Sequence, residues 1–264
     1  MMRARQFAVI AALVGCVGAA LAQSETTREL HKVYPLAKDG RVKIDTYKGS
    51  ITVTTWDKAE AEVHVRIEAD GSRQRDEQNV ALTEIEMRSS AKELRIESDY
   101  RKIRSRGFFG DDGNLPLVHY TLTMPATAEL EIEDYKSASS IRELKADLRF
   151  ETYKGTLDAE GLAGAVKLET YKGDIDVAFA TLQGDCRMET YKGTIRIRIP
   201  KGAGFEINAE IGRRADLESD FSLSGLREGG NRDDKEYRGP VNGGGPEIRL
   251  ETYKGKYSLV AAEK

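Results

Sequence analysis

The sequence predicts an all-β protein made of stacked strand repeats, a β-solenoid with 18–20 residues per coil. Three observations predict it: a repeated five-residue motif, alternation of apolar and polar residues around the motif, and a second glycine that closes each unit. The motif Glu/Asp-Thr-Tyr-Lys-Gly starts at Asp45, Glu151, Glu169, Glu189 and Glu251, and a degenerate copy occupies Glu133–Ser137. A fixed period of about 20 residues is typical of repeat proteins, in which each unit buries its apolar face against the next.

The first 22 residues have the features of an export signal and are left out of the fold prediction. Arg3 and Arg5 form a basic start, Phe7–Val17 is apolar, and Ala20–Ala22 offers a small-x-small cleavage site near Ala22. The apolar run is too short for a convincing membrane-spanning helix. Cleavage here predicts an exported protein, either periplasmic or at the cell surface.

A second processing route competes with simple cleavage. Leu13–Cys16 resembles a lipoprotein box, in which Cys16 would be the lipidated first residue. The apolar stretch Val17–Ala22 that follows is atypical, because lipoproteins usually continue with polar tether residues. A membrane partner is expected only if Cys16 is lipidated, and both routes take the protein out of the cytoplasm.

The charge balance restricts the partners. Without Arg3 and Arg5 the chain keeps 39 of its 41 basic residues against 44 acidic ones, a net charge of −5. This mild acidity, with both signs interleaved, argues against nucleic acid and against an anionic membrane surface as the main partner. After cleavage Cys186 is the only cysteine, so no intramolecular disulfide is expected and Cys186 is predicted to be a core residue.

Residues 23–125 form a less regular β part. Val63–Ile67, Leu94–Ile96 and Val118–Leu122 are predicted strands, and Asp76–Met87 gives a weak helical signal. A loop around Gly107–Asp112 carries Phe108 and Phe109, which we expect to tuck onto the rest of the protein rather than touch a membrane.

Residues 126–264 form the repeat region, continuous with the preceding part in one domain. In the strand before each motif, apolar residues and the motif threonine share one face, while charged residues and the tyrosine share the other. In one repeat, Val166, Leu168 and Thr170 are predicted to point inward. Lys-Gly then breaks the strand, since glycine tolerates the positive φ of a tight turn. The glycines that close successive units are Gly164, Gly184 and Gly204.

The repeat changes near its end. Phe205–Ile211 alternates as a strand, but Glu210-Ile211 stands where Tyr-Lys is expected, so the tyrosine ladder should be interrupted there. Residues 225–246, rich in glycine and charge, are predicted to be an excursion loop before the last strand pair.

These features together resemble the bacterial putative-adhesin β-strand-repeat family, a domain of unknown function. The resemblance covers about residues 40–262 and rests on repeated Thr-x-x-Gly-x-Ile/Leu-x-Val units, on Pro125 and Pro200 at strand ends, and on Val241–Leu250 before the final repeat. It implies an exported β-repeat fold and an adhesive role. Family members more often carry small polar residues where this chain has Tyr-Lys.

Catalytic signatures are weak. His31, His64 and His119 have no second ligand at metal-binding spacing, and the sequence holds no nucleophile-elbow, Walker or dinucleotide motif. Asp174 and Asp176 could imitate the carboxylate cluster of a polysaccharide-active β-helix enzyme. Exposed carboxylates among basic residues lack the desolvation that raises a pKa, so we expect no enzyme, no metal and no cofactor.

The motif side chains are the candidate binding strip. Stacked coils would align the tyrosines in one column, the glutamates in a second and the lysines in the turn. The column could be purely structural, because stacked aromatic pairs contribute about 0.5–1.5 kcal/mol each. It could also bind sugar rings or a partner protein, since Tyr is enriched at interfaces. The candidate residues are Tyr135, Tyr153, Tyr171, Tyr191, Tyr253, Lys154, Lys172, Lys192, Glu151, Glu169 and Glu189.

The sequence therefore predicts an exported, non-enzymatic envelope or surface scaffold that binds an envelope glycan or protein through its Tyr/Lys/Glu face. Two alternatives remain open: a periplasmic regulatory or stress-sensing module with a membrane partner, and a polysaccharide-active β-helix enzyme.

Overall fold

The computed structural model describes residues 26–104, 113–223, 227–229 and 235–263. The predicted export signal, Cys16, and the loop residues Phe108 and Phe109 lie outside the described residues.

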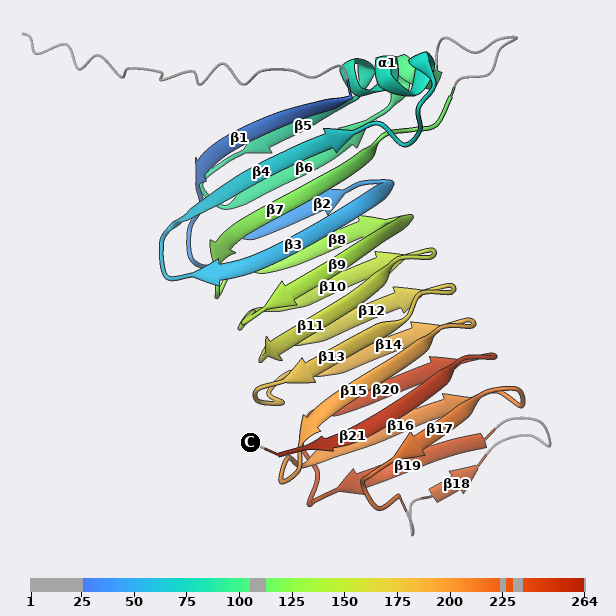
Figure 1. Ribbon diagram of the computed structural model, residues 1–264. Coiled ribbons are helices and arrows are strands. Elements are labelled where there is room, and N and C mark those ends of the chain that lie inside the picture. Colours follow the sequence, from blue (N-terminus) through green and yellow to red (C-terminus); the bar gives the residue numbers. More distant parts are fainter. Residues whose placement is uncertain (1–25, 105–112, 224–226, 230–234, 264) are drawn as a thin grey trace, which may run out of the picture.

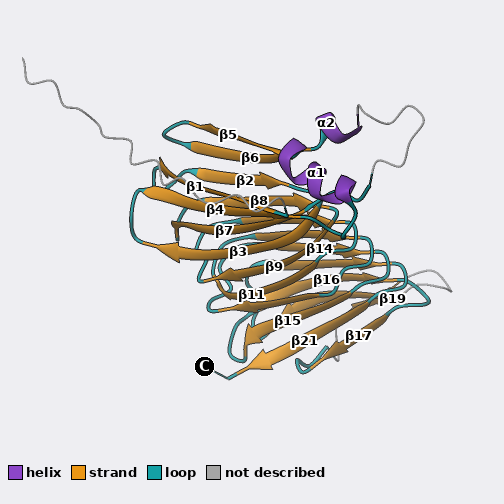
Figure 2. Ribbon diagram, turned by 45° about the horizontal axis from the view of Figure 1, so that its top comes forward, coloured by secondary structure: helices purple, strands orange, loops and turns teal. Residues whose placement is uncertain are grey.

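Two large sheets face each other across one hydrophobic core (Figures 1 and 2). Sheet 1 has ten strands in the order β1 (Thr27–Pro35), β4 (Glu60–Glu68), β7 (Leu117–Pro125), β3 (Lys48–Trp56), β9 (Lys136–Arg142), β11 (Thr156–Leu162), β13 (Ile175–Phe179), β15 (Thr194–Pro200), β21 (Lys256–Ala262) and β17 (Asp216–Ser219). Sheet 2 has eleven in the order β18 (Arg227–Gly229), β19 (Lys235–Val241), β16 (Phe205–Ile211), β20 (Glu247–Thr252), β14 (Cys186–Thr190), β12 (Val166–Thr170), β10 (Leu148–Thr152), β8 (Glu129–Asp134), β2 (Arg41–Asp45), β6 (Glu93–Asp99) and β5 (Glu84–Ser89). The predicted all-β class is confirmed.

Each motif joins a strand of sheet 2 to a strand of sheet 1. In sheet 2, equivalent strands pair in parallel without a shift in register, whereas β11 and β13 of sheet 1 shift register between Glu160 and Leu162. Thr170, for example, lies between Thr152 and Thr190. Because neighbouring strands are about 4.8 Å apart, equivalent side chains of successive motifs form straight rows across the sheet.

The order of the stack departs from the order of the sequence at its C-terminal end. β20 lies between β14 and β16, and β21 lies between β15 and β17. The reversal follows from β19, which runs antiparallel along β16 and ends at a turn with positive φ from Asn242 to Gly245. This turn returns the chain to the free edge of β16 as β20, so the last motif fills the space next to the repeat of Glu189.

The region 225–246 is therefore not an excursion loop, because β19 covers the outer edge of β16 over seven residue pairs. Its glycine and Pro240 hide the strand pattern in the sequence. The weak helical signal at Asp76–Met87 is correct only in part. Helix α1 (Gln74–Leu82) ends before extended Thr83, and Met87 belongs to β5, which pairs with β6. Together with the short helix α2 (Arg101–Arg104), α1 lies at the end of the stack formed by the N-terminal strands (Figure 2).

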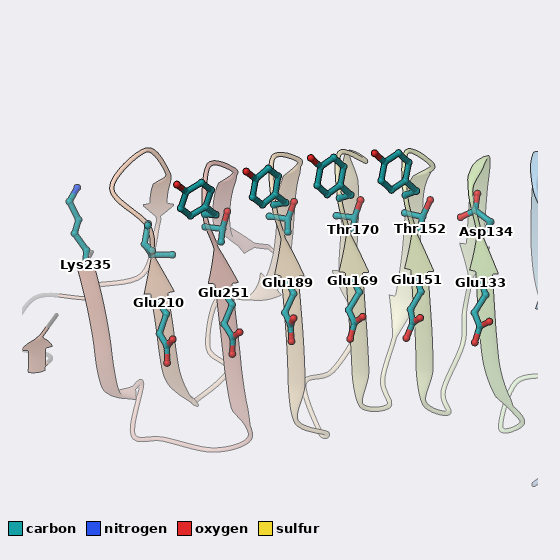
Figure 3. A pocket seen from close by; sticks show the side chains of 18 of the residues that line it. Glu133, Asp134, Glu151, Thr152, Glu169, Thr170, Glu189, Glu210, Lys235 and Glu251 are labelled. Carbon is teal, nitrogen blue, oxygen red and sulfur yellow. The ribbon is translucent and has the colours of Figure 1, made fainter. Parts of the chain in front are cut away.

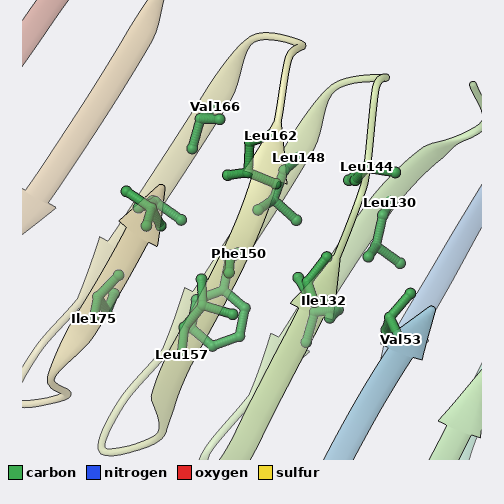
Figure 4. Close-up of a cluster of buried hydrophobic side chains, with 14 of the residues drawn as sticks. Val53, Leu130, Ile132, Leu144, Leu148, Phe150, Leu157, Leu162, Val166 and Ile175 are labelled. Atoms are coloured by element: carbon green, nitrogen blue, oxygen red, sulfur yellow. The ribbon is translucent and has the colours of Figure 1, made fainter. Parts of the chain in front are cut away.

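The core lies between the two sheets and is built from the predicted inward positions (Figure 4). Phe150 of β10 and Leu157 of β11 meet there, and Leu168, Met188 and Ile195 have no exposed surface. Cys186 is buried as predicted, and its burial raises the pKa of the thiol to about 12. A Cys186 thiolate is therefore scarce at neutral pH, as expected for a packing residue.

Four of the five motif glycines serve a different purpose from the one the sequence suggests. Gly49 has a positive φ of 136°, as predicted, but Gly155, Gly173, Gly193 and Gly255 are absent from the residues with positive φ. Instead, a Cβ on Gly173 would lie 1.9 Å from the carbonyl oxygen of Gly155, and one on Gly193 would lie 2.0 Å from that of Gly173. Close stacking of the turns requires glycine here, not a left-handed backbone.

Candidate functional site

A column of six stacked tyrosine rings runs along the edge where sheet 2 turns into sheet 1. Ring centroids of neighbours are 4.7–5.2 Å apart and ring planes differ by 3–14°. The members in order are Tyr47, Tyr135, Tyr153, Tyr171, Tyr191 and Tyr253. We call this set the tyrosine column. The adjacency predicted for Tyr153, Tyr171 and Tyr191 is present.

The structure adds Tyr47, which the candidate strip predicted from the sequence does not include. It stands 88 residues before Tyr135 in the chain, yet β2 pairs directly with β8 and brings the two rings together. Its motif, Asp45–Gly49, is complete, so the motif itself is the signal that could have identified it.

The predicted interruption of the column at Glu210-Ile211 is wrong, because β20 rather than β16 lies next to β14 and stacks Tyr253 on Tyr191. Glu210 pairs with Glu251 and Ile211 with Thr252, which leaves Gly212 opposite Tyr253. Gly212 has no side chain to extend the column. Tyr253 is therefore the last ring, stacked on Tyr191 and 57% exposed.

The geometry changes how the column can bind a ligand. Tyr135, Tyr153, Tyr171 and Tyr191 each stack on a ring at both faces. Sugar rings bind aromatic side chains by covering a free face, so these four tyrosines offer only their edges and hydroxyl groups. Tyr253 stacks on one side only within the described residues, and it is the ring whose face can receive a ligand.

A row of glutamates crosses sheet 2 beside the column (Figure 3). Each lies two residues before a tyrosine of the column, except Glu210, which lies two residues before Gly212. The strand registers place them in the order Glu133, Glu151, Glu169, Glu189, Glu251 and Glu210, and we call this set the glutamate row. A second, mostly basic row lies two residues earlier on the same strands. There Arg149 pairs with Glu151, Lys167 with Glu169 at 2.9 Å, Arg187 with Glu189, and Arg249 with Glu251 at 2.7 Å. The basic row thus offsets the repulsion between neighbouring carboxylates.

An open groove of about 950 Å³ follows the column and the row across the sheet (Figure 3). Tyr153, Tyr171, Tyr191 and Tyr253 line it together with the glutamate row and the threonines between them. Lys235 and Glu236 of β19 close its C-terminal end. The structure thus brings the predicted tyrosines and glutamates into one elongated site, which β19 completes.

The threonines hold the turns above the groove. Thr152, Thr170, Thr190 and Thr252 are buried, and each Oγ1 accepts a hydrogen bond from the N–H of the glycine three residues later, at 2.7–2.8 Å. The inward position predicted for Thr170 is confirmed, and its hydroxyl satisfies a backbone group of the turn.

The degenerate copy replaces this threonine with Asp134. Its Oδ2 accepts hydrogen bonds near the turn, among them one from the Ser137 N–H, whereas its Oδ1 is buried with no hydrogen-bond partner among the described residues. Burial raises the pKa of Asp134 above its ordinary value of 3.8. The carboxylate is therefore a weak point at one end of the groove.

Replacing Asp134 by Thr, the residue of the other repeats, is expected to raise the free energy of unfolding at neutral pH by about 0.5–2 kcal/mol. The folded state holds the Asp134 proton at pH values where the unfolded state has lost it. Wild-type stability therefore falls as pH rises from 3.8 through the raised pKa, and the threonine removes this loss. Urea unfolding of the wild type and the Asp134→Thr variant across this pH range measures the two free energies of unfolding. If the advantage of the variant shrinks as pH rises, the raised pKa of Asp134 is contradicted.

The turn lysines lie outside the groove. Lys136, Lys154, Lys172 and Lys192 are exposed and Lys254 is partly exposed. Unlike the basic row, none of these five has a carboxylate within 4.0 Å in the described part of the chain. Neighbouring ammonium groups about 5 Å apart in water repel each other by about 0.8 kcal/mol.

The remaining sequence candidates do not line the groove: Asp174 lies directly before β13, and the others lie on strands of sheet 1. Asp174 accepts a hydrogen bond from the Thr194 N–H at 3.2 Å, and Asp176 pairs with Arg198 at 2.9 Å. His31, His64 and His119 belong to β1, β4 and β7. No group of three or more His, Cys, Asp or Glu able to hold a metal ion occurs among the described residues.

Comparisons with known proteins add little. No protein-family model and no curated protein matches the chain. Similar solved structures include a candidate cell adhesion protein from Clostridium sporogenes (13% identity, TM-score 0.44, covering 90% of this chain and 100% of that one) and a candidate adhesin from Bacteroides fragilis (14%, 0.46, 89% and 97%). At TM-scores below 0.5 these likenesses establish neither a shared fold nor a shared function. Within the described residues, no helix is both long and apolar enough to cross a membrane.

Proposed function

We propose that this chain is an exported, non-enzymatic β-solenoid scaffold of the cell envelope that holds an elongated glycan or protein segment along its groove. The observation that carries the proposal is the groove itself. It presents the same Glu, Thr and Tyr positions from one repeat to the next, so it can make one set of contacts several times along a partner.

The chemistry of the groove suits binding more than turnover. The carboxylates of Glu151, Glu169 and Glu189 are held by basic partners on their own strands. An acid catalyst instead needs a desolvated carboxyl group opposite a second one across a cleft. The glutamates and the tyrosine edges supply repeated hydrogen-bond acceptors and hydroxyl groups, which suit the hydroxyl and amide groups of an extended polymer.

Tyr253 adds the anchoring contact. Its free face lies near the end of the groove, where Gly212 leaves space and Lys235 and Glu236 supply polar groups. A sugar ring or a flat side chain could stack on Tyr253 while the rest of the ligand follows the glutamate row.

The proposal is tested by screening the purified protein on an array of defined glycans and extended peptides. Glu151→Gln/Glu169→Gln/Glu189→Gln is expected to weaken the best ligand at least about tenfold, since each lost hydrogen bond contributes about 0.5–1.5 kcal/mol. Tyr253→Ser should weaken it as well. Asp174→Asn/Asp176→Asn, on sheet 1, is the matched control and should bind like wild type.

Folding of each variant is checked by circular dichroism and by the unfolding midpoint. If the Glu151→Gln/Glu169→Gln/Glu189→Gln variant binds the best ligand as tightly as wild type, the groove is not the binding site. Turnover of a glycan that disappears in the Asp174→Asn/Asp176→Asn variant would overturn the non-enzymatic assignment.

A further inference from the structure

The five turn lysines occupy a straight edge of the molecule, beyond the tyrosine column. Their backbone fixes this arrangement, because each lysine N–H donates to the carbonyl oxygen of a tyrosine in the neighbouring turn. The distances are 2.9 Å for Lys136 to Tyr47, 2.8 Å for Lys154 to Tyr135, 3.1 Å for Lys172 to Tyr153, 3.0 Å for Lys192 to Tyr171 and 3.0 Å for Lys254 to Tyr191. The lysines therefore repeat at the spacing of the strands, about 4.8 Å.

We propose that Lys136, Lys154, Lys172, Lys192 and Lys254 form a linear cationic ridge that binds an anionic polysaccharide. The proposal rests on the scaffold function above and assigns it a ligand class, but it places the contact outside the groove.

The ammonium groups of the ridge stay beside the tyrosine column. The Nζ atoms of Lys154, Lys172, Lys192 and Lys254 lie 5.1–5.8 Å from tyrosine ring centroids, within the range of a cation–π contact. Lys154, Lys172 and Lys192 are exposed and Lys254 is partly exposed, so the contact with the rings does not bury these side chains.

The ridge is an exception within an acidic protein. The basic row of sheet 2 is paired with the glutamate row, and Lys48 at the N-terminal end pairs with Asp70 at 2.6 Å. The ridge lysines have no carboxylate within 4.0 Å among the described residues, and Asp174, the acidic residue that follows Lys172 most closely, accepts from the Thr194 N–H. The net charge of the whole chain is negative and disfavours polyanions on the rest of the surface. At the ridge, however, a linear polyanion would relieve the repulsion between neighbouring lysines.

The shape and surroundings of the ridge favour a polysaccharide over other polyanions. Single-stranded nucleic acid binds by stacking its bases on aromatic faces, and the interior rings of the column have none free. Peripheral binding to a membrane combines basic residues with inserted apolar side chains. Among the described residues the exposed large hydrophobic side chains are Val33, Tyr153 and Tyr253, which do not form a patch beside the ridge that could insert. Lysine ammonium groups are compact point charges that suit the carboxylate or sulfate groups of a sugar chain.

The test measures binding of the purified protein to immobilised heparin and polygalacturonate, with neutral dextran as the uncharged polymer. Lys154→Gln/Lys172→Gln/Lys192→Gln is expected to weaken binding to an anionic polymer at least about tenfold, since three exposed ion pairs are lost, and high salt should weaken wild type similarly. The matched control is Lys38→Gln/Lys92→Gln/Lys201→Gln. It removes the same charge from exposed lysines that already pair with Asp57, Asp39 and Glu263, and should bind like wild type.

Three outcomes would overturn the ridge: unchanged binding by the ridge variant, an equal loss in the control variant, or preferential binding of phosphatidylglycerol vesicles or oligothymidylate. Binding to polygalacturonate reports recognition of carboxylates, and binding to heparin without binding to polygalacturonate reports a requirement for sulfate. A loss of binding by the ridge variant to either polymer supports the ridge. The Glu151→Gln/Glu169→Gln/Glu189→Gln variant is measured in parallel. A loss in that variant alone would overturn the ridge while leaving the groove function standing.

Discussion

Replacing Leu168 by Ala is expected to lower the free energy of unfolding by about 2–5 kcal/mol. Leu168 is fully buried at the centre of β12, and its neighbours in register are Phe150 and Met188. Strands on both sides fix the backbone here, so the cavity cannot collapse easily and the lost packing is not recovered. Urea or guanidinium unfolding, followed by circular dichroism, measures the change.

Lys167→Ala, on the solvent side of the same strand, is the control. It removes one exposed ion pair to Glu169 and should change stability by no more than about 1 kcal/mol. An unchanged unfolding midpoint for Leu168→Ala, or an equal loss in both variants, would show that the two faces of β12 have been assigned the wrong way round.

Replacing Gly173 by Ala is expected to destabilise the protein by about 1–3 kcal/mol or more. The new methyl group would lie 1.9 Å from the Gly155 carbonyl oxygen, a backbone atom that no side-chain rotation can move away. The turns would have to separate, which would also weaken the hydrogen bond from the Gly173 N–H to Thr170 and the stacking of Tyr171.

Gly202→Ala is the matched control for this experiment. A Cβ at Gly202 would meet nothing within 4 Å and its φ is not positive, so the substitution should be neutral or stabilise the protein by up to about 1 kcal/mol. Equal unfolding midpoints for the two alanine variants would contradict the requirement for close turn stacking.

Local patterns were enough to predict much of this protein. Period-2 alternation identified the inward residues of the repeat strands, including Leu168, Met188 and Ile195, because burial of one face of a strand depends on immediate neighbours. The threonine-to-glycine hydrogen bonds also follow from a spacing of three residues. The adjacency of Tyr153, Tyr171 and Tyr191 follows from the near-constant motif spacing.

The errors concern contacts between distant parts of the chain. No local pattern reveals that β20 lies between β14 and β16, or that β2 lies beside β8. The sequence prediction therefore omits Tyr47 from the column and places an interruption before Tyr253 that the structure does not have. The Lys-Gly pair of the motif correctly predicts a turn. The sequence does not show that a side chain at the glycine position would collide with the backbone of the neighbouring turn. The ion-pair partners of the glutamates are basic residues two positions earlier on the same strands. These residues lie outside the five-residue motif, so the motif alone does not predict the pairs.

The position of β20 and β21 also constrains how the chain folds as it is made. The segment from β16 to β19 is synthesised before them, yet its final neighbours in both sheets are β20 and β21. Folding therefore cannot advance repeat by repeat from the N-terminus through this region. A ribosome-bound chain that ends before residue 247 would leave the edges of β14 and β15 unpaired, open to another chain. The C-terminal end of both sheets can therefore be completed only after β20 and β21 have been made.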